Sequence, residues 1–84
     1  MSDRLAIGFR QEEGAVGRII GLVERRGFEL LGIAMTGEPP AALLTLDVRP
    51  RDGGRRLDVL DLQLRRLEGV SQVSVFPHAS GANK

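Results

Sequence analysis

The sequence contains no cysteine, no tryptophan and no tyrosine, and it has one histidine and three phenylalanines in 84 residues. Without cysteine the chain can form no disulfide, thiolate metal site or thiol nucleophile. So few aromatic residues argue against a sheet that stacks nucleic-acid bases. No apolar run approaches the about 20 residues of a membrane-spanning helix, and the first residues, MSDR, lack the apolar core of a signal peptide. We therefore expect a cytoplasmic protein.

Charge is nearly balanced, with a formal net charge of +1, so the chain has no field that would gather nucleic acid or anionic lipid. We expect neither as a partner. The hydrophobic fraction of 42% and the charged fraction of 27% are those of a globular protein. We expect one domain over residues 1–84, with a core of about 4–76 and a flexible tail at 77–84. A core this small is marginal, so association would stabilise it.

The spacing of apolar residues predicts four strands and two helices in the order strand, helix, strand, strand, helix, strand. The expected ranges are 5–10, 15–26, 30–36, 42–49, 55–68 and 70–76. Gly27 and Gly69 follow the two helices as C-terminal stops. This order predicts an α+β fold, the ferredoxin-like βαββαβ sandwich, with a four-stranded antiparallel sheet and both helices on one of its faces.

The same spacing predicts which faces are buried. The inward positions of the helices and of the third strand are Ala15, Val16, Ile19, Ile20, Leu22 and Val23, then Leu57, Leu60, Leu64 and Leu67, and Leu44, Leu46 and Val48. The open face of the sheet is expected to be flat, with few charges; its small residues are Ala6, Gly8, Gly32, Ala34, Thr45 and Ser74. A sheet face so bare tends to be covered by a partner.

Two further surfaces are candidate partner interfaces. Gly17 and Gly21 lie opposite the apolar stripe of the first helix, where each costs about 1 kcal/mol relative to alanine. They either form a groove for a partner or are tolerated surface glycines. Val59 and Leu62 point away from the leucine stripe of the second helix, which favours a partner contact there.

The sequence offers no catalytic residue and no metal site. His78 follows Pro77 in the expected tail, where nothing would hold it against a substrate. Glu12 and Glu13 precede the first helix, where negative charge suits the helix dipole, and a cation would need further ligands. The segment 14–17 is neither a P-loop nor a dinucleotide fingerprint. The chain is therefore not expected to be an enzyme.

Residues 11–30, QEEGAVGRIIGLVERRGFEL, resemble the signature of an ACT domain and, more narrowly, that of the short regulatory subunit of acetolactate synthase. The matching positions are Gly14, Ala15, Arg18, Gly21, Leu22, Arg26, Gly27 and Phe28. Residues 57–75 resemble the closing leucine-rich helix and strand of that family, so the resemblance spans 4–76.

The resemblance implies a non-catalytic small subunit, binding no cofactor itself, that docks on and activates a large subunit in branched-chain amino acid synthesis. That large subunit holds thiamine diphosphate, magnesium and FAD. In feedback-sensitive members, valine binds between two ACT domains, at positions that correspond here to Gln11, Gly14, Ala15 and Val16 of one chain and to Glu29 and Leu30 of its neighbour. Gln11 and Glu29 stand where the family has asparagine, so we expect weak or absent valine binding.

The strand expected at 30–36 contains no charge or proline that would discourage pairing with another strand. We therefore expect a homodimer, formed edge to edge through this strand and the first helix. The alternative to a synthase subunit is a stand-alone dimeric ACT domain that senses an amino acid for another enzyme or regulator.

Overall fold

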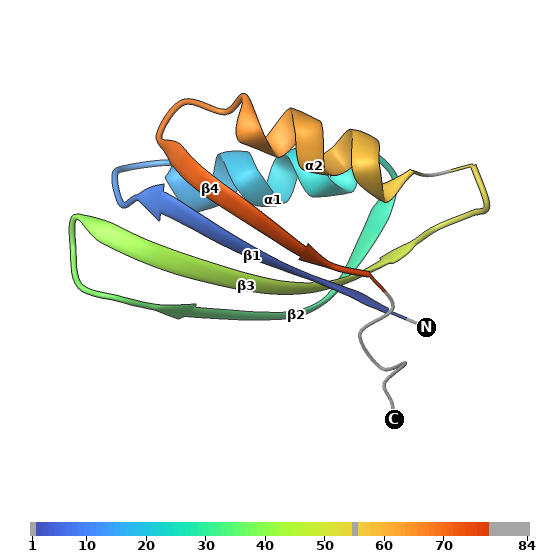
Figure 1. Cartoon of the computed structure of the whole chain (residues 1–84), viewed down its shortest axis with the longest axis horizontal. Coiled ribbons are helices and arrows are strands. Elements are labelled where there is room, and N and C mark those ends of the chain that lie inside the picture. Colours follow the sequence, from blue (N-terminus) through green and yellow to red (C-terminus); the bar gives the residue numbers. More distant parts are fainter. Residues whose placement is uncertain (1, 55, 78–84) are drawn as a thin grey trace.

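Figure 1 shows two helices on one face of a four-stranded antiparallel sheet, in a computed structural model that describes residues 2–54 and 56–77. The elements are β1 (Asp3–Arg10), α1 (Ala15–Arg25), β2 (Phe28–Thr36), β3 (Ala41–Pro50), α2 (Leu57–Arg65) and β4 (Val70–Phe76). The strand order is β2-β3-β1-β4, which places β2 and β4 at the edges. The predicted ferredoxin-like fold is confirmed. His78 and the rest of the expected tail beyond Pro77 lie outside the described residues.

The second helix is shorter than the leucine spacing predicts. It begins at Leu57, after Arg56 in an extended conformation, and it ends at Arg65. Beyond it, the Arg66 amide donates to the Gln63 carbonyl and the Leu67 amide to the Leu64 carbonyl, at 3.2 and 3.1 Å. These bonds join residues three apart, so the last turn tightens and Leu67 meets the core from a turn. The prediction that this helix extends over 55–68 is therefore wrong at its C-terminal end.

β1 and β2 begin earlier in the chain than the alternation of apolar residues predicts. β1 begins at Asp3, and β2 begins at Phe28 because Phe28 pairs with Pro50 at the end of β3. At the first helix the boundary agrees with the sequence to within one residue, since Arg26 caps α1 and Gly27 has a φ of 86°. Only glycine adopts that conformation without strain, and the chain reverses there into β2.

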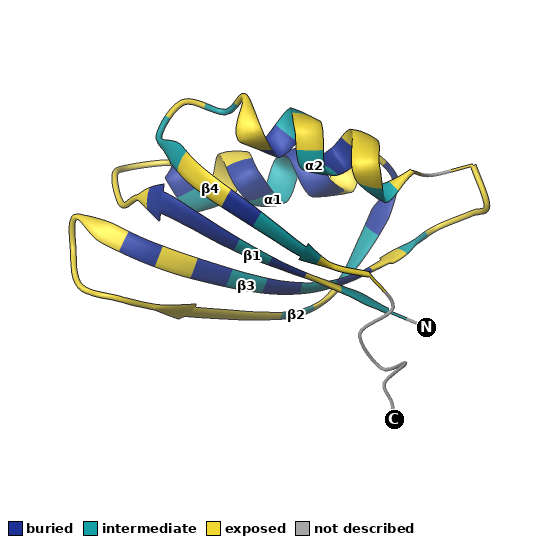
Figure 2. Cartoon of the chain, in the orientation of Figure 1, coloured by how far each residue is buried: buried dark blue, intermediate teal, exposed yellow. Residues whose placement is uncertain are grey.

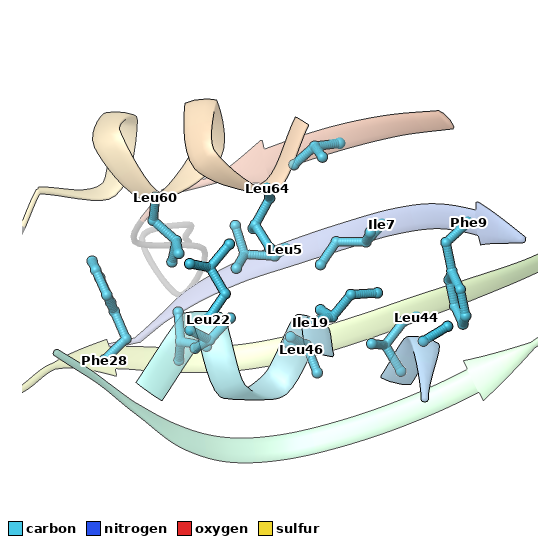
Figure 3. Packing of buried hydrophobic residues seen from close by; sticks show 14 of the residues in the cluster. Leu5, Ile7, Phe9, Ile19, Leu22, Phe28, Leu44, Leu46, Leu60 and Leu64 are labelled. Atoms are coloured by element: carbon cyan, nitrogen blue, oxygen red, sulfur yellow. The ribbon is translucent and has the colours of Figure 1, made fainter. Parts of the chain in front are cut away.

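The core lies between the helices and the covered face of the sheet (Figure 3). Its fully buried side chains alternate along the central strands, as Leu5 and Ile7 do on β1 and Leu44 and Leu46 on β3. The other buried members are Phe9, Ala15, Ile19, Leu22, Val23, Phe28, Ala42, Val48, Leu60, Leu64 and Val73. Val16, Leu57 and Leu67 are only partly buried against this cluster. The predicted inward faces are thus confirmed, with Val16, Ile20, Leu57 and Leu67 at the margin.

The edge strand β2 leaves the core along its length. Ile33 pairs with Leu46 and Met35 with Leu44, so both side chains lie on the helix-covered face. Their exposed fractions are nevertheless 51% and 46%, and Leu31, at the register shift of this strand, is 45% exposed. Figure 2 shows the exposed part of β2 at the sheet margin. The helices therefore cover the start of β2 and leave its second half as an apolar edge.

Backbone hydrogen bonds gather the loops at the two ends of the sheet. At one end, the Gln11 amide donates to the Pro40 carbonyl (2.7 Å) and the Arg10 amide to the Gly69 carbonyl (2.8 Å). This joins the loops between β1 and α1, β2 and β3, and α2 and β4. At the opposite end, the Arg51 amide donates to the Gly27 carbonyl at 2.9 Å.

Candidate functional site

The turn before α1 is built by Gly14, whose φ of 82° places it in the left-handed region. Its carbonyl accepts the first helical hydrogen bond from the Arg18 amide at 3.0 Å. The Ala15 amide already donates to the Glu12 carbonyl, also at 3.0 Å, and within the described residues no side chain caps the helix. Because Ala15 is bonded and its side chain is buried, any acceptor at this end of the helix would be bound by the next amides, of Val16 and Gly17.

The space beside this turn is too small for an amino acid. The small, partly open cavity between α1 and the start of β4 has a volume of about 10 Å³, room for one water molecule. It is lined by Phe9, Arg10, Ala15, Arg18, Ile19, Leu67, Glu68, Gly69 and Val70. An open depression of about 220 Å³ lies over the ends of β1 and β3, beside Arg10, Pro40 and Ser71. One chain by itself therefore provides no closed amino-acid pocket here.

The structure brings only part of the predicted ligand set together. Gln11, Gly14, Ala15 and Val16 gather at one end of the sheet. Glu29 lies at the other end, because it pairs with Arg49 whereas Arg10 pairs with Ala41. Eight residues of β3 separate those two levels, or about 27 Å. Glu29 and Leu30 thus cannot join the Gln11 turn of their own chain.

Glu29 is held in an ion pair that the sequence pattern did not indicate. Arg49 Nη2 lies 2.8 Å from Glu29 Oε1, and Arg49 Nε lies 3.3 Å from the same oxygen. The hydrogen bonds from Arg49 lower the pKa of the Glu29 carboxyl below its ordinary value, with a further contribution from the charge of Arg51. Glu29 is therefore ionised, but its charge is balanced by a cross-strand arginine.

The open sheet face is less bare than expected. Residues paired across antiparallel strands share a face, and Arg4 pairs with Asp47 on the face away from the helices. Arg4 Nε lies 2.8 Å from Asp47 Oδ1, and the Glu29–Arg49 pair lies on the same face. The expectation of few charges is wrong for the part of the open face that carries these two ion pairs. At Gly8 the open face is covered by the Gln72 side chain of the neighbouring strand β4, since a Cβ at Gly8 would lie 3.0 Å from Gln72 Cγ.

The two ends of the sheet differ in charge. The gathered loops at residues 11–14, 37–40 and 66–69 carry four glutamates, Glu12, Glu13, Glu38 and Glu68, and one arginine. In the described part of the opposite end, residues 26–27, 51–54 and 56 carry Arg26, Arg51 and Arg56 against Asp52. These loops are therefore acidic beside the Gln11 turn and basic beside Glu29, although Arg10 and Arg18 lie close to Glu68 and Arg56 is paired with Asp58.

The predicted partner-facing positions on the helices are exposed or partly exposed. Val59 and Leu62 have exposed fractions of 38% and 50% on the outer side of α2. On α1, Gly17 is exposed, with nothing within 4 Å of a Cβ built there, whereas Arg25 Nη1 lies 3.3 Å from the corresponding position at Gly21. An open hollow of about 160 Å³, lined by Arg26, Gly54, Arg56 and Val59, separates the C-terminal end of α1 from the start of α2. Sequence reasoning missed this hollow, because it depends on how the helices pack.

Residues 2–54 and 56–77 contain no cluster of three or more histidine, cysteine, aspartate or glutamate side chains that could hold a metal ion. Neither helix in this part of the chain is long and apolar enough to cross a membrane.

A sequence model of the ACT domain matches residues 11–73. No curated protein matches this chain significantly in sequence. Among solved structures, the ACT domain of GTP pyrophosphokinase from Chlorobium tepidum is similar, with a TM-score of 0.75 and 17% identity over 90% of this chain and 97% of that one.

Further similar solved structures include the following two. The C-terminal domain of the MgtC protein from Mycobacterium tuberculosis has a TM-score of 0.73 and 16% identity, covering 99% of this chain and 93% of that one. The ligand-free regulatory subunit of aspartate kinase from Thermus thermophilus has a TM-score of 0.63 and 17% identity, covering 90% and 50%. At these identities the likeness shows the shared fold.

Proposed function

The chain belongs to the ACT domain family, and on that premise we propose that it is a non-catalytic regulatory subunit that docks on and activates the large subunit of acetolactate synthase. ACT domains are regulatory rather than catalytic, and they often dimerise and bind amino acids. The narrower assignment to acetolactate synthase is supported by the sequence resemblance over residues 4–76, above all the motif at 11–30. The thiamine diphosphate, magnesium and FAD of the reaction would belong to the large subunit.

We propose that the chain acts as a homodimer joined through β2. The observation that carries this is the apolar edge formed by Leu31, Ile33 and Met35, which no helix covers. An antiparallel pairing of two β2 edges places the start of one strand beside the end of the other. Because the Gln11 amide is bonded to the loop that follows β2, this pairing brings the Gln11 turn of one chain toward Glu29 of the partner subunit.

Charge supports the same arrangement. In an antiparallel pair, the acidic loops of one chain lie beside the basic end of the other, where Arg51 follows β3. The two halves of the predicted ligand site, which are about 27 Å apart in one chain, are also brought together. The dimer is thus the smallest assembly in which an amino acid could contact both sets.

Activation would act through the conformational equilibrium of the large subunit. A partner that binds the active form more tightly shifts the population toward that form, by no more than its difference in affinity for the two forms. No catalytic group of this chain is required. The expected result is a higher turnover or better cofactor retention by the large subunit when this chain is present.

Reconstitution tests the proposal. The purified chain is titrated into the large subunit from the same cell, and acetolactate formation is measured. A rate that rises to saturation supports the assignment. An unchanged rate and unchanged cofactor retention across saturating ratios would contradict the assignment.

The second candidate is a stand-alone dimeric amino-acid sensor. The uncapped start of α1 behind Gly14 favours it, because free helix amides can hold a carboxylate. Glu29 disfavours it, because this residue stands where the resembling family has an asparagine amide, and its carboxylate is paired with Arg49. Calorimetry with valine, leucine and isoleucine separates the candidates, since micromolar affinity for any of them would support the sensor.

A further inference from the structure

The outer surface of the helix layer carries an excess of arginine. Residues 15–26 and 56–66 contain six arginines, Arg18, Arg25, Arg26, Arg56, Arg65 and Arg66, against Glu24, Asp58 and Asp61. Two of the arginines are neutralised locally. Arg56 Nη2 lies 2.6 Å from Asp58 Oδ2, and Arg65 Nε lies 2.9 Å from Asp61 Oδ1. Within residues 2–54 and 56–77, the other four, Arg18, Arg25, Arg26 and Arg66, have no such carboxylate partner.

Two of these four, Arg26 and Arg66, flank an apolar ridge. Val59, Leu62 and Arg66 are spaced by three and four residues, so they lie along one side of α2, opposite the buried Leu60 and Leu64. In Figure 2 the outward turns of α2 are exposed while its inner positions are buried. The ridge therefore offers two aliphatic side chains between Arg26, at the basic end of the sheet, and Arg66, which is followed by Glu68 in the acidic loops.

A hollow adjoins the ridge. The 160 Å³ space between the end of α1 and the start of α2 is bounded by Arg26, Gly54, Arg56 and Val59. A cavity of about 150 Å³ accommodates a benzene ring, so the hollow has room for one aliphatic or aromatic side chain. Buried anchors of this kind, with charged groups at the rim, are typical of protein interfaces.

We propose that this surface, the ridge of Val59 and Leu62 with the adjoining hollow and the flanking Arg26 and Arg66, docks an acidic segment of the catalytic partner. An apolar side chain of that segment fills the hollow, and its carboxylates meet the two arginines. The inference rests on the proposed function for the existence of a partner, and it adds the chemistry of the contact. It leaves β2 free for the dimer, because the ridge faces away from the sheet.

The test measures the affinity of the full chain for the large subunit by calorimetry. Arg26→Glu and Arg66→Glu are each expected to weaken binding about tenfold or more. Arg4→Glu, the same change of charge on the sheet face away from the helices, is the matched control and is expected to stay within about threefold. Thermal unfolding of each variant checks that these exposed substitutions leave the fold intact.

A pair of substitutions at one position reports the sign of the partner's charge. Leu62→Glu is expected to bind at least about tenfold more weakly than Leu62→Lys, since both lose the aliphatic contact but only glutamate repels an acidic segment. The reverse order, or unchanged affinity in both, would overturn the docking inference while the wild-type interaction stands.

Two other outcomes also decide the matter. If the wild-type chain does not bind the large subunit, the proposed function fails, and the docking inference fails with it. If the chain instead binds vesicles of anionic phospholipid and Leu62→Glu abolishes that binding, the ridge serves a membrane surface and the inference is overturned.

Discussion

Arg49 of β3 donates two hydrogen bonds to one oxygen of Glu29 on β2, the shorter at 2.8 Å. The two residues are direct partners in the strand register, so the ion pair links the neighbouring strands β2 and β3. From the sequence, Glu29 only adds a negative charge where a ligand carboxylate would lie. The structure shows that this charge is balanced, so the remaining obstacle to such a ligand is the loss of an amide side chain.

Replacing Arg49 with glutamine is expected to raise the pKa of Glu29 toward its ordinary value, because the hydrogen bonds and positive charge that lower it are removed. A pKa lowered by folding contributes stability that is present above the unfolded pKa of glutamate and is lost as pH falls through the folded pKa. Both side chains are exposed, so the change in stability is small. NMR titration measures the pKa of Glu29 in the wild-type chain and in Arg49→Gln. Arg56→Gln, which removes the partner of Asp58 instead, is the control. An unaltered Glu29 titration in Arg49→Gln would show that the pair does not form in solution.

Lysine at Ile33 is expected to convert the dimer to a monomer at micromolar concentration, because charge on an edge strand opposes strand pairing. Leu43→Lys is the control: Leu43 is also an exposed aliphatic residue, but it lies on β3 and on the other face of the sheet. Sedimentation velocity distinguishes the two states. A wild-type chain that is already monomeric would contradict the dimer.

Salt is expected to weaken the same dimer. Its proposed contacts include exposed charges of opposite sign at the two ends of the sheet. At physiological ionic strength such charges are largely screened from one another beyond a distance of about 8 Å, and this distance shortens as salt is added. The dissociation constant should rise between low and high salt and level off where apolar contact remains. No change with salt would indicate that the charged ends do not meet.

The two glycines at the start of α1 are expected to respond oppositely to alanine. Gly14→Ala should destabilise the chain by about 1–2 kcal/mol, because an L-residue is strained at its φ of 82°. Gly17→Ala should stabilise it by about 0.5–1 kcal/mol, since the helical backbone favours alanine and nothing lies within 4 Å of the new Cβ. Urea unfolding measures both. Stabilisation combined with lost activation in Gly17→Ala would place Gly17 at a partner interface.

Restoring the family's amides is expected to raise valine affinity. In Gln11→Asn with Glu29→Asn, both positions regain the side chain that the resembling subunits use, and Arg49 is freed. Calorimetry should show tighter binding than in the wild-type chain. Arg4→Gln, which breaks the other ion pair on the open sheet face, controls for a change of charge there. Equal valine affinity in the wild-type chain, the double variant and Arg4→Gln would indicate that the ligand site lies elsewhere.

The sequence by itself determined the order of elements, the ferredoxin-like fold and most of the core. Alternation of Leu44 and Leu46 defines the buried face of a strand, and Gly27 ends a helix by a local backbone preference. These signals depend on nearest neighbours along the chain, so they can be read without a structure. The Asp61–Arg65 pair, four residues apart on α2, was predictable for the same reason.

Only the tertiary structure decided what depends on packing between distant segments. Ile33 and Met35 have the period of a half-buried strand, yet they are exposed because the helices cover only the start of the edge strand. The Glu29–Arg49 pair depends on strand register, and the hollow beside Val59 on how one helix end meets another. The separation of Glu29 from the Gln11 turn likewise follows from strand direction. Such relations join residues far apart in the chain, and local periodicity carries no information about them.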